Sequence, residues 1–394
     1  MKTNWQTKKL GDVCDFQNGF AFKGGLFKEN GLPVLRISNI QNDGISYKRL
    51  VFFNKNDYKE DFNKYQALKG DLVIAMSGAT TGKLAICDAD EIFYLNQRVG
   101  KFKPKKDLLN NYLYYFLSTR IEENLKISTG SAQPNLSTEQ IKALQIPIPT
   151  LSEQHRIVKI LDETFEKIEK AKENTEKNLG NSQELFKSYL QSVFVNPKKN
   201  WKIKTLKEIT SVLGDGLHGT PKYSVDGEYY FINGNNLNNG NIIFKENTKK
   251  VAVEEYDKYK KNLNSRTVLV SINGTLCNIA FYNNEKIILG KSACYFNLLN
   301  GVDKNFIKYI ILSPYFIKYA FKEATGATIK NVSLKTMRAF QIHLPEFEEQ
   351  GIIVAKLDKL SAETKKLEVV YKRKLADLEE LKKSVLKRAF NGDL

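Results

Sequence analysis

The sequence predicts an α+β protein in which two similar, mixed, strand-rich domains are separated by two long antiparallel helices that form a coiled coil. The first observation is an internal pseudo-two-fold repeat. Thr129 matches Thr325, and the same offset of 196 residues holds along the chain of 394 residues. The second observation is that each copy begins with short apolar runs and ends in a charged stretch with helical periodicity. The expected parts are a domain at 1–150, a helix at 151–196, a second domain at 197–346 and a helix at 347–394.

In the first part of each copy the apolar runs are short and are bounded by turn-forming residues, a pattern that predicts strands. In the first copy the strands are expected at residues 33–38, 71–77, 83–87 and 92–95. A helix should follow from Asp107, which aligns with Asp303 in the second copy. Both aspartates are predicted N-caps, since a side-chain oxygen can accept from the free backbone N–H groups of a first helical turn.

The last part of each copy has the spacing of a heptad repeat. The expected seam is Ile157, Leu161, Thr164, Ile168, Ala171, Thr175, Asn178, Ser182, Leu185 and Tyr189 in the first copy, and Ile353, Leu357, Leu360, Thr364, Leu367, Tyr371, Lys374, Leu378, Leu381 and Val385 in the second. Both seams are weakly apolar in the middle, so neither helix should be stable alone, and their equal length favours pairing. Asn178 and Lys374 would then fix the register. The alternative is two independent surface helices, each on its own domain.

The charge balance points to a polyanionic partner. The chain carries 61 Lys and Arg against 44 Asp and Glu, a formal net charge of +17, with 42% hydrophobic residues. Residues 1–150 and residues 201–350 each carry a net charge of +6, so the two domains share the excess equally. Such a field attracts a polyanion over long range, and nucleic acid is the first candidate.

The sequence also indicates a compartment. No apolar run approaches the roughly 18 residues that a membrane span requires, and the first residues lack an apolar signal segment. A cytoplasmic protein without a membrane partner is therefore expected. The four cysteines lie far apart and only three histidines are present, which predicts neither a metal site nor disulfide bonds.

No motif in the sequence predicts catalysis. Residues 77–83 superficially match a phosphate-binding loop, but three residues instead of four separate the glycines, and Leu84 follows the lysine. The second copy, residues 273–279, lacks the lysine altogether. No cluster of carboxylates repeats in both copies. We therefore expect no catalytic residues, and interpret the 77–83 loop as a tight turn or as a loop that presents polar groups to DNA.

Without a predicted catalytic site, the function that the sequence favours is DNA recognition. Asn and Gln side chains can form two hydrogen bonds with an adenine edge, and Arg can do so with guanine. The candidate DNA-binding residues, all in loops beside strands, are Arg36, Ser38, Asn39, Ser77, Thr80, Lys83, Gln97, Arg98 and Gln133 in the first copy, and Asn233, Asn235, Asn236, Asn273, Lys291, Ser292 and Lys330 in the second. For each Asn the competing role is turn formation. Asn135 and Asn331 should be structural, since a residue identical in both copies cannot distinguish two half-sites.

Three stretches, residues 129–157, 325–350 and 381–394, together with the duplication, make the chain resemble a specificity subunit of a type I restriction–modification system. The resemblance implies that each domain is a target-recognition domain that reads one half of a split, asymmetric double-stranded DNA target. The helix pair would set the gap between the halves and dock two methyltransferase (modification) subunits. Those subunits would methylate adenine with S-adenosylmethionine, and restriction/translocase subunits would use ATP and Mg²⁺ for cleavage. This chain itself would bind no cofactor.

Two other hypotheses stay open at this point. The chain could be a scaffold whose duplicated domains bind proteins, or a self-sufficient methyltransferase or nuclease. The dependence of DNA affinity on salt separates the first from DNA recognition, because phosphate contacts give a steep loss of affinity as salt rises. Activity of the purified chain alone would establish the second.

Overall fold

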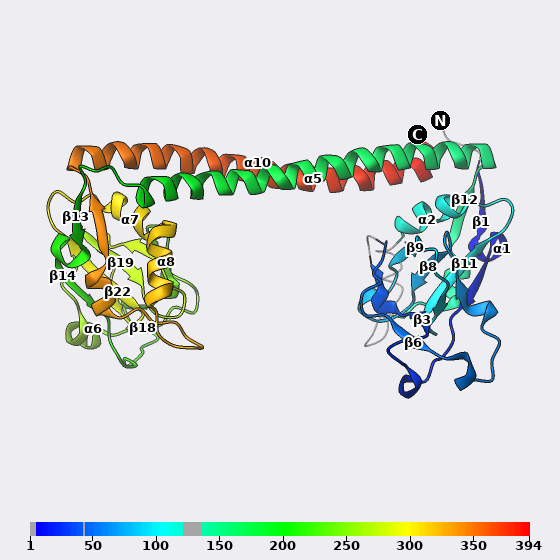
Figure 1. Ribbon diagram of the computed structural model, residues 1–394, viewed down its shortest axis with the longest axis horizontal. Coiled ribbons are helices and arrows are strands. Elements are labelled where there is room, and N and C mark those ends of the chain that lie inside the picture. Colours follow the sequence, from blue (N-terminus) through cyan, green and yellow to red (C-terminus); the bar gives the residue numbers. More distant parts are fainter. Residues whose placement is uncertain (1–4, 42–43, 121–134) are drawn as a thin grey trace. The chain divides into compact units, whose positions relative to one another are not determined.

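The computed structural model describes residues 5–41, 44–120 and 135–394, and it consists of two compact units (Figure 1). Unit 1 comprises Met1–Thr175 and Lys374–Leu394, and unit 2 comprises Glu176–Arg373. Each unit therefore holds one strand-rich domain together with a part of each long helix.

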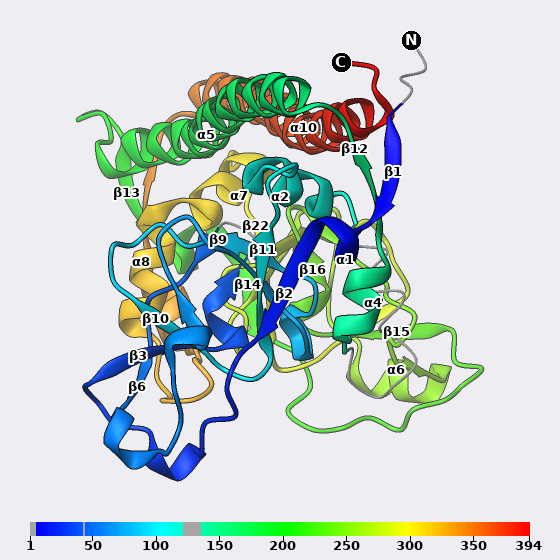
Figure 2. The same cartoon turned by 90° about the vertical axis from the view of Figure 1, so that its right-hand side faces the viewer.

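The described residues of unit 1 form two four-stranded sheets and two two-stranded sheets. Its strands are β1 (Gln6–Lys9), β2 (Cys14–Asn18), β3 (Leu32–Leu35), β4 (Ile40–Gln41), β5 (Gly44–Ile45), β6 (Val51–Phe53), β7 (Gln66–Ala67), β8 (Leu72–Ala75), β9 (Leu84–Ile86), β10 (Phe93–Leu95), β11 (Val99–Pro104) and β12 (Gln145–Ile148), and its short helices are α1 (Leu10–Val13), α2 (Asn110–Ser118) and α4 (Thr138–Ala143). The sheet orders are β2-β11-β8-β9 and β6-β3-β10-β7, with β3 and β10 parallel. Helix α2 packs against β9 and β11 (Figure 1), and β1 pairs with β12 beside α1 and α4 (Figure 2).

Unit 2 repeats most of this topology, with a three-stranded sheet in place of the second four-stranded one. Its strands are β13 (Lys202–Thr205), β14 (Thr210–Asp215), β15 (Tyr229–Ile232), β16 (Leu237–Asn238), β17 (Asn241–Ile242), β18 (Lys250–Val251), β19 (Thr267–Ser271), β20 (Ile279–Phe281), β21 (Ile287–Leu289), β22 (Ala293–Leu298) and β23 (Gln341–Leu344), and its short helices are α6 (Val253–Tyr259), α7 (Lys304–Leu312), α8 (Pro314–Glu323) and α9 (Leu334–Ala339). The sheet β14-β22-β19-β20 matches β2-β11-β8-β9, and the parallel pair β15–β21 matches β3–β10. The repeat and the mixed, strand-rich class are confirmed.

The predicted strands are confirmed in position, with one correction. The run at 33–38 is a strand only to Leu35, after which Ile37–Asn39 form one turn of 3₁₀ helix. A polar side chain in that turn, Asn39, bonds back to the backbone of Arg36 and bends the chain out of the sheet.

Of the two predicted N-caps, one is confirmed and one is wrong. The Asp303 carboxylate accepts from the backbone N–H groups of Asn305 (2.7 Å) and Phe306 (2.9 Å) at the start of α7. Helix α2 instead begins at Asn110, with Leu109 at the capping position. The backbone N–H of Leu109, which has no acceptor within the helix, donates to the side-chain oxygen of Gln154. This glutamine is buried and lies on the long helix that begins at Leu151.

The two long helices are α5 (Leu151–Val195) and α10 (Phe347–Asn391), each of 45 residues. In unit 1 they run antiparallel: Arg156 donates to the carbonyl oxygen of Leu394, whereas Lys172, later in α5, pairs with Glu379, earlier in α10. None of the helices in the described ranges is both long and apolar enough to cross a membrane.

Both long helices contribute to the core of each unit. In unit 1, Ile157 and Leu161 of α5 and Leu386 and Ala389 of α10 pack into the same cluster as α2. In unit 2, Leu190 and Phe194 of α5 and Val354 and Leu357 of α10 do the same with α7. Within each unit the helices thus share one core, which contradicts the alternative of independent surface helices.

The predicted seam is correct in part. Ile157, Leu161, Ile168 and Leu357 are buried, and Ile353, Leu360 and Leu378 are half-buried. Leu185, Leu367 and Leu381 are wrong, because they are 55%, 42% and 47% exposed, and Tyr189, Asn178 and Lys374 are exposed as well. Asn178 and Lys374 therefore do not fix the register from inside the seam.

The inward face moves by one residue along α5. Leu190 is buried where Tyr189 was expected, and the half-buried Phe186 replaces Leu185. A straight helix has 3.6 residues per turn and drifts about 20° per heptad from a 3.5-residue pattern, so the neighbouring position takes over after a few heptads.

Candidate nucleic-acid interface

In unit 1 the loops that carry the predicted DNA-binding residues meet at one edge of the two sheets. The backbone N–H of Met76, after β8, donates to the carbonyl of Arg98 (2.9 Å), and the N–H of Leu136 donates to the carbonyl of Met76 (2.7 Å). The N–H of Asn96 donates to the carbonyl of Leu35 at the end of β3 (2.9 Å). We call this set, residues 36–39, 77–83, 96–98 and 135, the reader edge of unit 1.

The same bonds recur in unit 2. The N–H of Ile272 donates to the carbonyl of Ser292 (3.0 Å), the N–H of Val332 to the carbonyl of Ile272 (2.8 Å), and the N–H of Gly290 to the carbonyl of Ile232 (2.8 Å). The reader edge of unit 2 is accordingly residues 233–236, 273–278, 290–292 and 330–331. In both units, therefore, the same backbone hydrogen bonds bring together loops that lie far apart in the sequence.

Two of the predicted DNA-binding residues are internal clamps instead. Asn39 is 2% exposed; its amide oxygen accepts from the N–H of Arg36 (3.0 Å), and its amide nitrogen donates to the carbonyl of Ser46 (2.9 Å). Asn236, 5% exposed, bonds in the same pattern to Asn233 (3.0 Å) and to Ile243 (3.0 Å). Both ends of each amide are occupied, so these side chains hold the loop and do not face a base.

Ser77 and Asn273 also support the edge from within. Ser77 is buried, its hydroxyl accepts from the guanidinium of Arg98 (3.2 Å), and its backbone forms a β-bridge with Asn135. Asn273 bridges Asn331 in the same way, and their side-chain amides share a 3.1 Å hydrogen bond. The side-chain bond favours the structural role that was expected for Asn331, whereas the bridge to Asn135 is made by its backbone and its side chain is exposed.

The 77–83 loop has the geometry of a tight turn. Gly78 and Gly82 have φ angles of 78° and 84°, values that favour glycine. Thr80 donates to the carbonyl of Ile37 (3.0 Å), and Lys83 donates to the side chain of Gln41 (3.2 Å). The turn thus braces the loop after β3.

The remaining predicted residues are accessible. Those with exposed side chains are Ser38, Gln97, Arg98, Asn235, Lys291 and Lys330, whereas Arg36, Thr80, Lys83, Asn233 and Ser292 are half-buried. Gln133 lies outside the described residues. The exposed set consists of amides, hydroxyls and cations, which are the donors and acceptors that contact base edges and phosphates.

The described residues offer little for covalent chemistry. In residues 5–41, 44–120 and 135–394, no three His, Cys, Asp or Glu side chains gather as a metal site. Burial raises the pKa of Cys14, Cys87 and Cys277 to about 12, so these thiols stay protonated and are poor nucleophiles near neutral pH. His218 is exposed and bonds to Asp215 (2.6 Å).

Two contacts between domain and helix repeat in both units and were missed from the sequence. Gln154 and its counterpart Gln350 are fully buried, and they bond to the backbone at the starts of α2 and α7, respectively; Gln350 accepts from the N–H of Asp303 (2.8 Å). Tyr115 likewise donates to Asp162, as Tyr309 does to Asp358. The sequence did carry a signal for these contacts, since residues 153–154 are identical to 349–350 and Asp162 is identical to Asp358 between the two copies.

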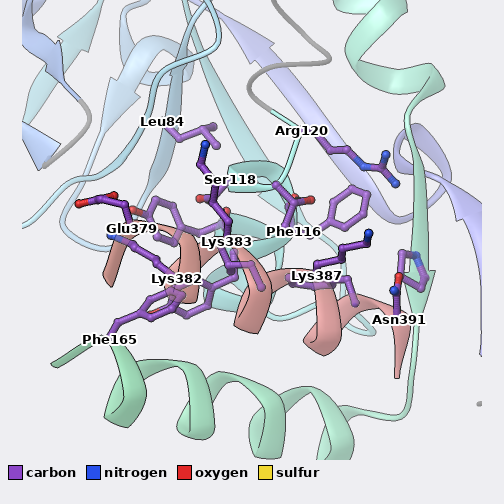
Figure 3. A pocket seen from close by; sticks show the side chains of 16 residues that line it. Leu84, Phe116, Ser118, Arg120, Phe165, Glu379, Lys382, Lys383, Lys387 and Asn391 are labelled. Carbon is purple, nitrogen blue, oxygen red and sulfur yellow. Dashed lines mark hydrogen bonds between the residues drawn. The ribbon is translucent and has the colours of Figure 1, made fainter. Parts of the chain in front are cut away.

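Unit 1 also has a hollow of about 760 Å³ where the end of α2 meets α5 and the last turns of α10 (Figure 3). Its lining combines aromatic rings with lysines. Lys382 lies over the ring of Phe165, 5.3 Å from its centroid, and Lys383 and Lys387 line the hollow beside it. The lining of this hollow is therefore partly cationic and partly apolar.

Comparison with known proteins gives a consistent result. The family described as "Type I restriction modification DNA specificity domain" matches residues 2–177 and 198–375. The specificity subunits of the type I restriction enzymes StySPI from Salmonella potsdam and EcoKI from Escherichia coli K12 are each 25% identical, over 99% of this chain and 89% of theirs. The MjaVIII specificity subunit from Methanocaldococcus jannaschii is 33% identical over 44% of this chain and 43% of its own length.

Solved structures share the fold. A chain from a study of complex assembly and conformational transition in the type I R-M system superposes with a TM-score of 0.78 at 18% identity, covering 99% of this chain and 98% of that one. The HsdS subunit from Thermoanaerobacter tengcongensis gives a TM-score of 0.63 at 18% identity, over 99% and 97% of the two chains.

Proposed function

The chain belongs to the family of type I restriction–modification DNA specificity domains, and from this premise we propose that its two units each read one half of a bipartite duplex-DNA target. The observation that carries the proposal is the repeated reader edge. The buried frame is the same in both units, as the amide clamps Asn39 and Asn236 illustrate, whereas the exposed side chains on it differ. Two different sets of base contacts predict an asymmetric target.

Charge supports a DNA ligand for both units. Each domain carries a net charge of +6, and the exposed Arg98, Lys291 and Lys330 lie on the reader edges. Phosphate contacts release counterions, so the logarithm of affinity falls with the logarithm of salt by about 0.9 per phosphate.

The test is duplex binding by the complete complex, measured across salt and with a pool of random sequences. We expect a steep salt dependence and enrichment of one bipartite motif. A flat salt dependence without enrichment would favour the scaffold hypothesis instead.

The long helices fit a second role, as spacer and docking surface. Each is continuous over 45 residues and contributes to the core of both units, so we propose that the pair sets the gap between half-sites. Leu185 and Leu367 in unit 2, and Leu381 in unit 1, are exposed apolar side chains on the helices, and such side chains suit contact with a protein partner.

We further propose that chemistry comes from partners. Two methyltransferase subunits would supply adenine methylation with S-adenosylmethionine, and restriction/translocase subunits would supply ATP- and Mg²⁺-dependent cleavage, in the cytoplasm where the DNA is. The relatives named above are likewise specificity subunits. Incubation of the purified chain alone with S-adenosylmethionine, or with Mg²⁺ and DNA, should leave the DNA unmodified and uncut. Modification or cleavage under those conditions would establish a self-sufficient enzyme.

A further inference from the structure

Hydrogen bonds identify which residues of the two reader edges occupy equivalent positions. Arg36 and Asn233 each donate a backbone N–H to their clamp amide (3.0 Å in both). Arg98 and Ser292 each accept, through the backbone carbonyl, from the residue that follows the equivalent strands β8 and β19. Arg36 therefore corresponds to Asn233, and Arg98 corresponds to Ser292.

In unit 2 these two positions touch. The hydroxyl of Ser292 donates to the amide oxygen of Asn233 (2.9 Å) and accepts from the N–H of Gly234 (2.9 Å). Both side chains are neutral, and the hydroxyl of Ser292 is hydrogen-bonded to the amide oxygen of Asn233.

In unit 1 the two equivalent positions hold arginines. Arg36 donates to the carbonyl of Arg49 (3.2 Å), and its Nε is buried without a partner. Arg98 is exposed and donates only one bond in the described structure, to the neutral hydroxyl of Ser77 (3.2 Å). In the described ranges neither guanidinium forms a salt bridge, and the hydrogen-bond partners of both are neutral.

We infer that Arg98 reads a guanine in the half-site bound by unit 1, an assignment that rests on the proposed function. A guanidinium donates two parallel N–H bonds to O6 and N7 of guanine in the major groove. A long 3.2 Å bond to a neutral hydroxyl is weak compared with a bond to a carboxylate, so Arg98 is free to exchange it for a base. Arg98 is exposed on the reader edge, so a base can reach its guanidinium. Unit 2 has a serine here and reads its own half-site with amides and Lys291 instead.

The test compares Arg98→Ala with Lys103→Ala in the complete complex. Lys103 is an exposed lysine near the far end of β11, so its replacement changes the charge of unit 1 by the same amount. Duplexes are selected from a random pool and sequenced, and affinity for the wild-type motif is measured across salt. Thermal unfolding confirms that both variants fold.

For Arg98→Ala we expect the preference for guanine to fall about 10- to 100-fold at one position of one half-site, with the other half-site unchanged. The salt slope should stay that of the wild type, and Lys103→Ala should keep the wild-type motif. An unchanged motif with a salt slope smaller by about 0.9 would make Arg98 a phosphate contact and overturn the inference. A wild-type complex that selects no motif would overturn the proposed function itself, which is a separate result.

Discussion

Removal of the buried clamp amides should damage each unit separately. Asn39→Ala deletes the hydrogen bonds to the N–H of Arg36 and to the carbonyl of Ser46, together with a longer one to the carbonyl of Lys48 (3.5 Å), and leaves the first two backbone groups without a side-chain partner. Each lost bond costs about 0.5–1.5 kcal/mol, and each partner left buried and unpaired adds to that. Because Arg36 and Ser46 are half-buried and water can reach them in part, we expect a total of about 2 kcal/mol.

Hydrogen exchange followed in peptides from each unit is the assay, because a chain with two units does not unfold as one two-state system. A local loss of about 2 kcal/mol corresponds to roughly 30-fold faster exchange. In Asn39→Ala this acceleration should appear in residues 36–46 and not in 233–243, and Asn236→Ala should show the reverse.

The neighbouring exposed residues are the matched controls. Ser38→Ala and Asn235→Ala should change exchange less than about twofold, since surface substitutions are usually within about 0.5 kcal/mol of neutral. In DNA selection, Asn39→Ala should weaken the choice of bases in one half-site only. The clamp assignment would be refuted if Asn39→Ala gave the same hydrogen exchange as Ser38→Ala, or if either clamp variant accelerated exchange equally in both units.

Three further outcomes are expected. Deletion of one heptad from each long helix should change the preferred spacing between half-sites in DNA selection and leave each half-sequence the same; an unchanged spacing would contradict the spacer role. Leu357→Ala should destabilise unit 2 by about 2–5 kcal/mol, measured by hydrogen exchange in peptides from that unit, because this side chain is fully buried, whereas Leu367→Ala, at a 42% exposed position, should have little effect. The four buried cysteines should react slowly with a thiol reagent at pH 8 in the folded protein and rapidly in denaturant. Burial raises the pKa of Cys14 to about 12, so the reactive thiolate becomes appreciable only as the pH approaches that value, and fast reaction of the folded chain would argue against this burial.

Some features of the candidate interface could be predicted because the chain repeats. The loops after β3 and β8 and before β11 were recognised from alternating strands and turns, and the structure brings them to one edge in each unit. The choice among neighbouring residues could not be predicted. Asn39 beside Ser38, and Asn236 beside Asn235, are equally polar in sequence, but one of each pair is buried with both ends of its amide bonded.

The sequence offset was also a limited guide to equivalence. An offset of 196 residues would pair Arg36 with Ile232, whereas the shared hydrogen bonds pair it with Asn233. Small insertions in loops shift the local offset and leave the strands in place, since loops tolerate changes in length that a sheet does not. The correspondence of Arg98 with Ser292 became visible only through the backbone bonds to the strands beside them.

By itself the sequence determined the duplication, four strands of the first copy, the two long helices and the Asp303 cap, because these depend on periodicity and on contacts within a few residues. Tertiary structure decided which side of each long helix faces inward and which polar side chains remain accessible to a ligand. Leu190 is buried and Tyr189 exposed although both are compatible with the helical pattern. Burial is a property of packing between segments far apart in the chain, and neither local propensity nor spacing carries that information.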